Sequence, residues 1–208
     1  MEIIASGAVQ HTVEEATFKR LEEELRDSWR AYRGFTISDS KGPIELDLVM
    51  VTHDRVVLVE VKHWSGKLTS FDGNWYVNGQ IRGRSPVHRK RDHASRLITI
   101  LKDELQHTLG YYPFVEAHVL LCGTSTTEHL PPREKRFAHN LEDFLKIREA
   151  AGYETILGEQ QVRFDENRLR PNSPENLKHF DEFFTRRHVT QENVQQKDQT
   201  QAPEMLSQ

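Results

Sequence analysis

The sequence predicts a mixed α/β fold in which a central mixed β-sheet is flanked by helices. Two observations predict it: short apolar runs follow one another through the middle of the chain, and long amphipathic stretches precede and follow them. The runs that fit strands include residues 44–52 and 55–62, and the stretches that fit helices include 13–32 and 86–108. We therefore expect a layered domain with the strands inside and the helices outside.

The elements are expected in a definite order along the chain. Residues 13–32 carry apolar side chains at helical spacing, among them Phe18 and Leu21, and predict the first helix. Ser85 is a good N-cap and Pro86 a good first-turn residue, so the second long helix should begin there. The other expected elements are strands near 35–39, 44–52, 55–62, 67–71, 74–78 and 114–121, a polar connection at 124–140, and helices near 141–151 and 174–188.

Composition favours one domain with a short appendage. With 208 residues and 36% hydrophobic content, the chain can form one core of about 120 to 180 residues. We expect residues 1–189 to form this domain and the Gln-rich residues 190–208 a disordered polar tail. Cys122 ends an apolar run, which indicates a buried structural thiol. No signal pattern or membrane-length apolar run occurs, so we expect a cytoplasmic protein without a membrane segment.

Two carboxylates interrupt the apolar strands in the middle of the chain. Asp47 lies in the first strand of an expected hairpin, and Glu60 lies in the second, followed by Val61 and Lys62. Side chains alternate faces along a strand, so Asp47 and Glu60 can point into one space, with Lys62 on the face of Glu60. Burying two uncompensated carboxylates costs several kcal/mol, so a cation should lie nearby.

This arrangement predicts a site for Mg²⁺, or alternatively Mn²⁺. Hard oxygen ligands favour these ions over zinc, and the backbone carbonyl of Val61 would be a third protein ligand. A metal at Asp47 and Glu60 would polarise a phosphoryl group and acidify its water, while Lys62 would orient that water or stabilise the developing charge. The alternative is a half-buried salt-bridge network on a solvated sheet face.

The sequence around these residues resembles a known family. The resemblance lies in Ile44–Val51, in Val57–Leu68 with its Glu-Val-Lys-His-Trp-Ser-Gly segment, in Gly73-Asn74-Trp75 and in Ser85-Pro86. Together they are similar to the nuclease-related domain (NERD) family over about residues 10 to 125. The resemblance implies the restriction-endonuclease-like core of the PD-(D/E)xK nucleases. It also implies that Asp47 and Glu60 are the metal ligands and that Lys62 is the catalytic lysine.

The resembled family also has a glutamate early in its first helix. Here Glu14 falls on the same helical face as Phe18, one turn earlier, whereas Glu15 and Glu22 project elsewhere. We expect Glu14, with Glu15 as the second choice, to share the metal or orient its water. The alternative is a favourable interaction of this carboxylate with the helix dipole.

One position departs from the family pattern. The resemblance implies an Asn-Pro-x-x-Gln helix start, whereas this chain reads Ser85-Pro86-Val87-His88-Arg89. A guanidinium in place of an amide favours direct phosphate contact and would weaken a bound metal electrostatically. This departure motivates an alternative function, a non-catalytic nucleic-acid-binding module with the same fold. A third hypothesis is a protein-interaction domain with a vestigial site.

A basic segment around this helix start is the candidate nucleic-acid contact. The chain has a formal net charge of −4, so local concentration of cations is needed to approach a polyanion. No aromatic residues interleave with the basic ones, which indicates backbone contacts and low sequence preference. The alternative is a solvated charged helix face. The candidates are Arg82, Arg84, Arg89, Lys90, His93 and Arg96.

The predicted function is therefore a metal-dependent nuclease that hydrolyses nucleic-acid phosphodiester bonds, with DNA favoured over RNA. A homodimer fits this class because many such folds cut duplexes as pairs, although the sequence identifies no interface.

Overall fold

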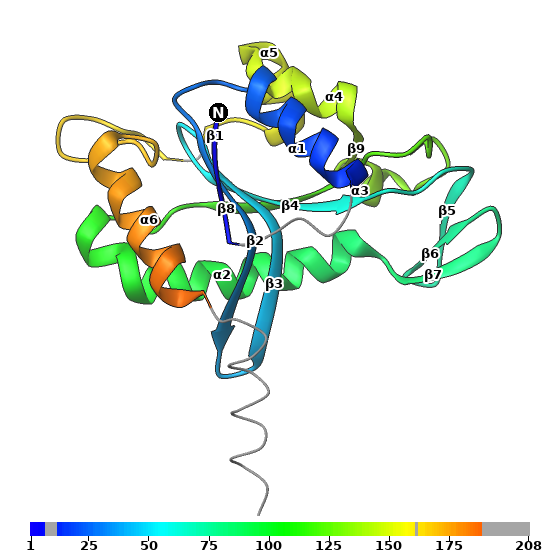
Figure 1. The fold of residues 1–208 in the computed structure, drawn as a ribbon, viewed down its shortest axis with the longest axis horizontal. Coiled ribbons are helices and arrows are strands. Elements are labelled where there is room, and N and C mark those ends of the chain that lie inside the picture. Colours follow the sequence, from blue (N-terminus) through cyan, green and yellow to red (C-terminus); the bar gives the residue numbers. More distant parts are fainter. Residues whose placement is uncertain (7–11, 161, 189–208) are drawn as a thin grey trace, which may run out of the picture.

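A computed structural model describes residues 1–6, 12–160 and 162–188. A six-stranded sheet in the order β1-β2-β3-β4-β8-β9 forms the centre, and a separate three-stranded sheet, β5-β6-β7, extends from one end (Figure 1). The strands are β1 Glu2–Ala5, β2 Arg30–Asp39, β3 Gly42–Val51, β4 Val56–Lys62, β5 Leu68–Phe71, β6 Asn74–Val77, β7 Gln80–Arg84, β8 Val115–Leu121 and β9 Ala138–Asn140. The helices are α1 Thr12–Glu24, α2 Pro86–Leu109, α3 Pro132–Lys135, α4 Leu141–Leu145, the 3-10 helix η1 Lys146–Arg148, α5 Ala150–Leu157 and α6 Pro174–Arg187.

The central sheet is mixed, as the sequence predicts. Strands β2, β3 and β4 pair antiparallel, whereas β1 joins β2, β8 joins β4 and β9 joins β8 in parallel. The predicted hairpin at the centre is confirmed, with Val51 opposite Val56 and Leu48 opposite Val59. The mixed α/β class is therefore confirmed.

Helices cover both faces of this sheet. On one face, Val49 and Leu58 pack with Leu97 of α2 and Phe183 of α6. On the other face, α1, α4 and α5 pack against the sheet through residues that include Leu21. Figure 1 shows α2 and α6 on the opposite side of the sheet from α1, α4 and α5. Each face of β3 and β4 therefore has its own helical layer.

Several predicted boundaries were wrong. The helix expected at 13–32 ends at Glu24, and its last three residues, 30–32, belong to β2. Trp29 and Tyr32 keep helical spacing with the apolar residues of α1. Tyr32 lies instead in a strand that has neighbours on both sides, β1 and β3, and is buried there, whereas Trp29 is buried just before that strand. The connection expected at 124–140 contains α3 and β9, and the helix expected at 141–151 is divided among α4, η1 and α5.

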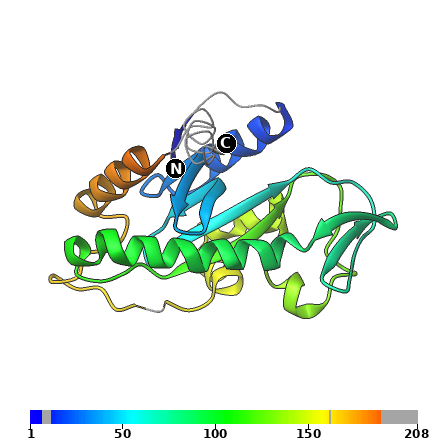
Figure 2. The ribbon, with the colours of Figure 1, turned by 90° about the horizontal axis from the view of Figure 1, so that it is seen from below.

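The three-stranded sheet contains two tight hairpins. Asp72-Gly73 and Asn78-Gly79 all have positive φ, the conformation of type I′ turns, which the Asp-Gly and Asn-Gly dipeptides adopt readily. Trp75 is fully buried at the base of this sheet. Seen from below, the sheet projects beyond the N-terminal end of α2 (Figure 2). The sequence predicted β5 and β6 but not β7.

Two further expectations concern the ends and the environment of the chain. The tail expected to be disordered, 190–208, lies outside the described residues. Among the helices of the described part, none combines the length and apolar character needed to span a bilayer.

Candidate functional site

The site lies where β3 and β4 diverge. Their ladder ends at the pair Leu48 and Val59; beyond this point β3 continues along β2, and β4 continues along β8. Asp47 is the next residue of β3, and its carboxylate accepts a hydrogen bond from the backbone N–H of Val61 at 3.0 Å. The side chain thus replaces the missing strand partner. This local geometry directs Asp47 toward the end of β4.

Glu60 is the centre of a cluster of cations. This residue is 2% exposed. Lys62 Nζ and an Arg89 guanidinium nitrogen both lie 2.6 Å from Oε1, and Lys90 Nζ lies 2.5 Å from Oε2. Lys62 comes from the same strand, and Arg89 and Lys90 come from the first turns of α2. The departure from the family pattern at Arg89 is therefore in direct contact with a predicted metal ligand.

The two carboxylates have opposite protonation preferences. Burial and the neighbouring charge of Glu60 raise the pKa of Asp47 to about 6, against the opposing effects of Lys90, Lys62 and the Val61 N–H. Burial alone would raise the pKa of Glu60, but Lys90 and Lys62 outweigh it and lower this pKa to about 2. In the described part of the chain, Asp47 has no ion-pair partner of its own. It is therefore the carboxylate whose charge an added cation would stabilise most.

Three of the predicted nucleic-acid contacts are engaged inside the fold. Lys90 is 2% exposed and also donates to the backbone carbonyl of Glu45 at 2.9 Å. Burial and the charge of Lys90 lower the pKa of His93 to about 4, so its ring is neutral near pH 7. Arg96 donates to Asp39 at 2.8 and 2.5 Å. Lys90 and Arg96 hold α2 against β3 and the end of β2, and none of the three side chains presents a free cation to a ligand near pH 7.

The other three basic candidates are accessible. Arg82 and Arg84 are exposed on β7, and Arg84 pairs with Asp92 at 3.1 Å in a solvated ion pair. The side chain of Arg89 is 47% exposed despite its contact with Glu60. Accessible cations therefore extend from the three-stranded sheet to the first turn of α2.

Glu14, the predicted helix carboxylate, belongs to a helix on the other face of the sheet from α2 and its cations. Helix α1 packs on the face of the sheet opposite α2. Burial raises the pKa of the Cys122 thiol, and the charge of Glu14 adds to this rise, so Glu14 lies near the end of β8. Glu15 pairs with Arg33 at 3.1 Å. A role for Glu14 in catalysis stays a prediction.

A buried glutamate that the sequence did not identify connects the three-stranded sheet to the start of α2. Glu134 of α3 is 1% exposed and accepts hydrogen bonds from Ser70 at 3.0 Å, from Ser85 at 2.9 Å and from the indole of Trp75. It joins the three-stranded sheet to the residue before α2. The neighbouring sequence did not reveal this role, because a glutamate in a polar stretch gives no indication that it is buried.

Asp47 and Glu60 could hold one divalent cation if Arg89 moved away from Glu60. Among the described residues, no group of three or more His, Cys, Asp or Glu side chains could hold a metal. Asp47 and Glu60 supply the hard oxygens that Mg²⁺ takes, and Mg²⁺ usually binds through one or two carboxylates plus water and phosphate. Glu60 is already paired through both oxygens, so Arg89, which is half-exposed, must leave Oε1 for a metal to bind there.

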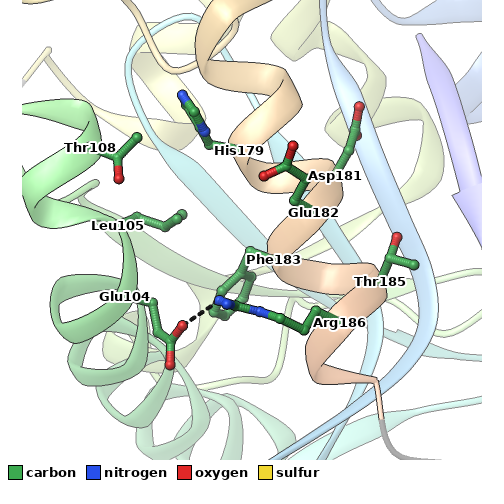
Figure 3. A pocket seen from close by; sticks show the side chains of 9 residues that line it. All are labelled: Glu104, Leu105, Thr108, His179, Asp181, Glu182, Phe183, Thr185 and Arg186. Atoms are coloured by element: carbon green, nitrogen blue, oxygen red, sulfur yellow. Dashed lines mark hydrogen bonds and ion pairs between the residues drawn. The ribbon is translucent and has the colours of Figure 1, made fainter.

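A separate hollow lies between the C-terminal half of α2 and α6. Figure 3 shows Glu104 and Leu105 of α2 facing Phe183 and Arg186 of α6, with Glu104 paired to Arg186. Glu104 follows Arg89 by fifteen residues in the same helix, which places it about 22 Å away. This hollow is therefore remote from the carboxylates.

Comparison with known proteins agrees with this geometry. The model of a family described as "Nuclease-related domain" matches residues 10–122. The chain belongs to the nuclease-related domain family. The match runs across α1 to the end of β8, so this nuclease-related domain contains Asp47, Glu60, Lys62 and Arg89 within the family region.

A curated relative shares part of this region. Over 72 residues the chain is 35% identical to the probable kinase PglW of Streptomyces coelicolor. These residues make up 34% of this chain and 4% of PglW. The matched stretch is thus a small part of a much longer protein, and the kinase activity in its name is said of PglW alone.

Proposed function

We propose that this nuclease-related domain is a metal-dependent nuclease that hydrolyses phosphodiester bonds in nucleic acid, DNA ahead of RNA, with low sequence preference. One observation carries the proposal: Asp47 faces the end of β4, where Glu60 and Lys62 lie 2.6 Å apart, at the point where two strands of the sheet diverge. Membership of the nuclease-related family supports the same chemistry.

Asp47 and Glu60 would hold Mg²⁺ or Mn²⁺, with the Val61 carbonyl as the predicted backbone ligand. Such an ion supplies Lewis acidity toward a phosphoryl oxygen and lowers the pKa of water. Lys62, whose side chain is 24% exposed, is accessible enough to hydrogen-bond a water molecule or a phosphate oxygen. Its fixed positive charge would stabilise the negative charge that develops on the phosphate during attack.

Arg89 would exchange partners when a substrate binds. A phosphate offers a guanidinium two parallel charge-assisted hydrogen bonds, whereas Glu60 Oε1 is shared with Lys62. Movement of Arg89 to the phosphate would leave Lys62 as the one remaining partner of Oε1 among the three cations, which opens this oxygen on the side of Arg89. Lys90, which is buried, stays on Oε2 and keeps Glu60 ionised.

A second candidate function is a nucleic-acid-binding module without catalysis. The observation that favours it is the balance of charge in the cluster, where three cations contact Glu60 alone. Such a cluster attracts phosphate without any metal. In that case Lys62 and Arg89 would be phosphate ligands, and Asp47 would have no function in binding.

A cleavage assay separates these candidates. Labelled single-stranded, duplex and branched DNA and RNA are incubated with Mg²⁺, Mn²⁺ or a chelator, and the wild type is compared with Asp47→Ala and Lys62→Ala. We expect metal-dependent cutting by the wild type and a loss of about 100-fold or more in each variant. The matched controls are Asp103→Asn and Lys178→Ala, both of exposed residues on the far parts of α2 and α6, which should cut like the wild type.

Two outcomes oppose the proposal. Cutting that persists unchanged in Asp47→Ala and Lys62→Ala would show that the activity does not come from this site. Absence of cutting by the wild type with every substrate and metal, together with salt-dependent binding of nucleic acid, would support the binding module instead.

A further inference from the structure

The three-stranded sheet exposes large apolar side chains to solvent. Phe71 is 75% exposed and Ile81 is 61% exposed, the two highest values for large hydrophobic residues in the described part of the chain. Both belong to this small sheet, Phe71 at the end of β5 and Ile81 in β7. Exposed apolar groups that gather on one element commonly mark an interaction site.

The pairing of the strands places these side chains on one face. Phe71 is opposite Asn74, and Asn74 is opposite Arg84; in the next row, Tyr76 is opposite Ile81. Side chains of paired residues point to the same face, and residues two apart in a strand share that face. We name the face that carries Phe71, Tyr76, Ile81 and Arg84 the outer face of the three-stranded sheet.

The opposite face of the sheet is fully used by the core. Leu68, Trp75 and Val77 alternate with the outer-face residues and are 0%, 0% and 2% exposed. They pack with Val87 of α2 and Val119 of β8. The small sheet is thus anchored through one face, and its outer face is not required for that packing.

Charge on the outer face favours a polyanion. Arg84 lies in the row of Phe71, and Arg82 is the extra residue at the irregularity between β6 and β7. Both are exposed. Arg84 pairs with Asp92 at 3.1 Å, but both side chains are more than 60% exposed, so this pair is weak and can be exchanged for a phosphate. Asp72, in the turn between β5 and β6, is an acidic residue next to Phe71.

We propose that the outer face binds single-stranded nucleic acid, with bases stacked on Phe71 and Tyr76 and the backbone contacted by Arg82 and Arg84. An aromatic ring can reach the face of a base only when that base is unstacked, as in a single strand. The combination of exposed rings and arginines fits this ligand better than duplex DNA, which would need cations alone. The inference rests on the proposed function in taking nucleic acid as the ligand.

The chain itself connects the outer face with the candidate site. The three-stranded sheet lies between Lys62, which ends β4, and Ser85, which precedes α2 and its Arg89. Both connections are short, and Glu134 hydrogen-bonds Ser70 of the sheet as well as Ser85. Arg84 of the outer face pairs with Asp92, three residues after Arg89 in α2. A single strand held on the outer face would therefore continue along α2 toward Arg89 and Lys62, which makes single-stranded nucleic acid the substrate class of the site.

Binding measured without cleavage tests this inference. Fluorescence anisotropy follows a labelled mixed-sequence 20-nucleotide DNA, single-stranded or duplex, in the presence of a chelator. Stacking of a base on an aromatic side chain predicts that Phe71→Ala weakens single-strand binding by roughly 5- to 100-fold, with less than a twofold change for the duplex. Phe71→Trp should restore the affinity. Tyr112→Ala, which removes a 50%-exposed ring elsewhere, is the matched control and should bind like the wild type.

Three results would overturn the inference. The first is equal single-strand affinity of Phe71→Ala and the wild type, and the second is an equal loss for single strand and duplex. The third is self-association of the wild type that Phe71→Ala abolishes without any change in DNA binding, because the face would then be an interface between two copies. Failure of the nuclease proposal looks different: the wild type would not cut, while Phe71-dependent binding would remain.

Discussion

Two clusters of buried charge lie at opposite ends of β4. One surrounds Arg55, immediately before the strand, and the other surrounds Glu60 near its end. Both contain carboxylates that are almost completely removed from solvent. They differ in how fully each carboxylate is paired, and the proposed function places the ligand at the cluster that is less fully paired.

The Arg55 cluster is closed. Arg55 is 1% exposed and donates to both oxygens of Asp54, at 3.0 and 2.9 Å, and to Glu116 at 3.0 Å. Its remaining donors reach backbone carbonyls that include those of Gly158 and Glu159. Burial would raise the pKa of Asp54, but hydrogen bonds from Arg55 and Tyr153 outweigh it and lower that pKa. Each charge has its partner within the fold.

The Glu60 cluster is open. Burial and the charge of Glu60 raise the pKa of Asp47 to about 6, whereas the pKa of Asp54 is lowered. Lys62 and Arg89 are partly exposed, so the cluster can exchange partners with a ligand. Burial alone therefore does not distinguish the two clusters; the Glu60 cluster differs in that Asp47 has no ion-pair partner among the described residues and lies beside partly exposed cations, which makes it the candidate for function.

The largest effect on stability should come from Arg55→Met. Removal of this guanidinium leaves Asp54 and Glu116 buried and unpaired, which should lower the free energy of unfolding by about 3 to 5 kcal/mol. Lys62→Met should change it by less than about 1 kcal/mol, since Glu60 keeps Arg89 and Lys90. Urea unfolding at pH 7.5 measures both. A larger loss in Lys62→Met than in Arg55→Met would reverse the assignment of the two clusters.

Neutralising one aspartate in each cluster should have effects of opposite sign. The pKa of Asp47 is raised in the folded state, so its contribution to stability is present at low pH and is lost as the pH rises through about 6. Asp47→Asn should therefore stabilise the fold by about 1 kcal/mol at pH 8 and not at pH 4.

The pKa of Asp54 is lowered, so its contribution is present at neutral pH and is lost in acid. Asp54→Asn should therefore destabilise the fold at pH 8, by about 2 kcal/mol.

Thermal unfolding of both variants across this pH range provides the measurement. Equal destabilisation by the two substitutions at pH 8 would show that Asp47 is as completely paired as Asp54, and the contrast between the clusters would disappear.

A smaller effect is expected from Arg89→Gln, which restores the amide that the resembled family carries. Removal of one positive charge from Glu60 should strengthen Mg²⁺ binding by about tenfold, since one cation fewer competes for Oε1. The Mg²⁺ concentration for half-maximal cleavage measures this effect, and Arg91→Gln on the same helix is the control. An unchanged or higher requirement for Mg²⁺ would show that Arg89 does not compete with the metal.

The sequence predicted the central part of the site because that part depends on local rules. Alternation along two strands joined by a tight turn was sufficient to bring Asp47 and Glu60 to one place and to put Lys62 beside Glu60. Pro86 was predicted correctly as the first residue of α2, whereas the predicted capping by Ser85 was wrong, because its side chain makes no capping hydrogen bond and donates to Glu134 instead. These inferences need only strand periodicity and helix-start preferences, which are properties of a few neighbouring residues.

Other features depended on contacts between distant segments. The burial of Lys90 follows from the packing of α2 on β3 and β4, and a lysine next to an arginine gives no sign of it. Glu134 is buried because the three-stranded sheet and α2 meet over it. The outer face was missed because β7 is a short strand rich in Gly and Arg, so the pairing that places Phe71 and Ile81 together was not visible.

Isothermal titration calorimetry of Mn²⁺ and Mg²⁺ into the wild type, Asp47→Asn and Asp54→Asn tests whether Asp47 and Glu60 bind a divalent metal. Asp54→Asn serves as the control for a buried aspartate, under conditions where circular dichroism shows it to be folded. We expect one divalent ion per wild-type chain, a loss of binding in Asp47→Asn, and binding by Asp54→Asn that equals the wild type. Absence of binding by the wild type, or equal binding by all three proteins, would contradict the assignment of Asp47 and Glu60 as a metal site.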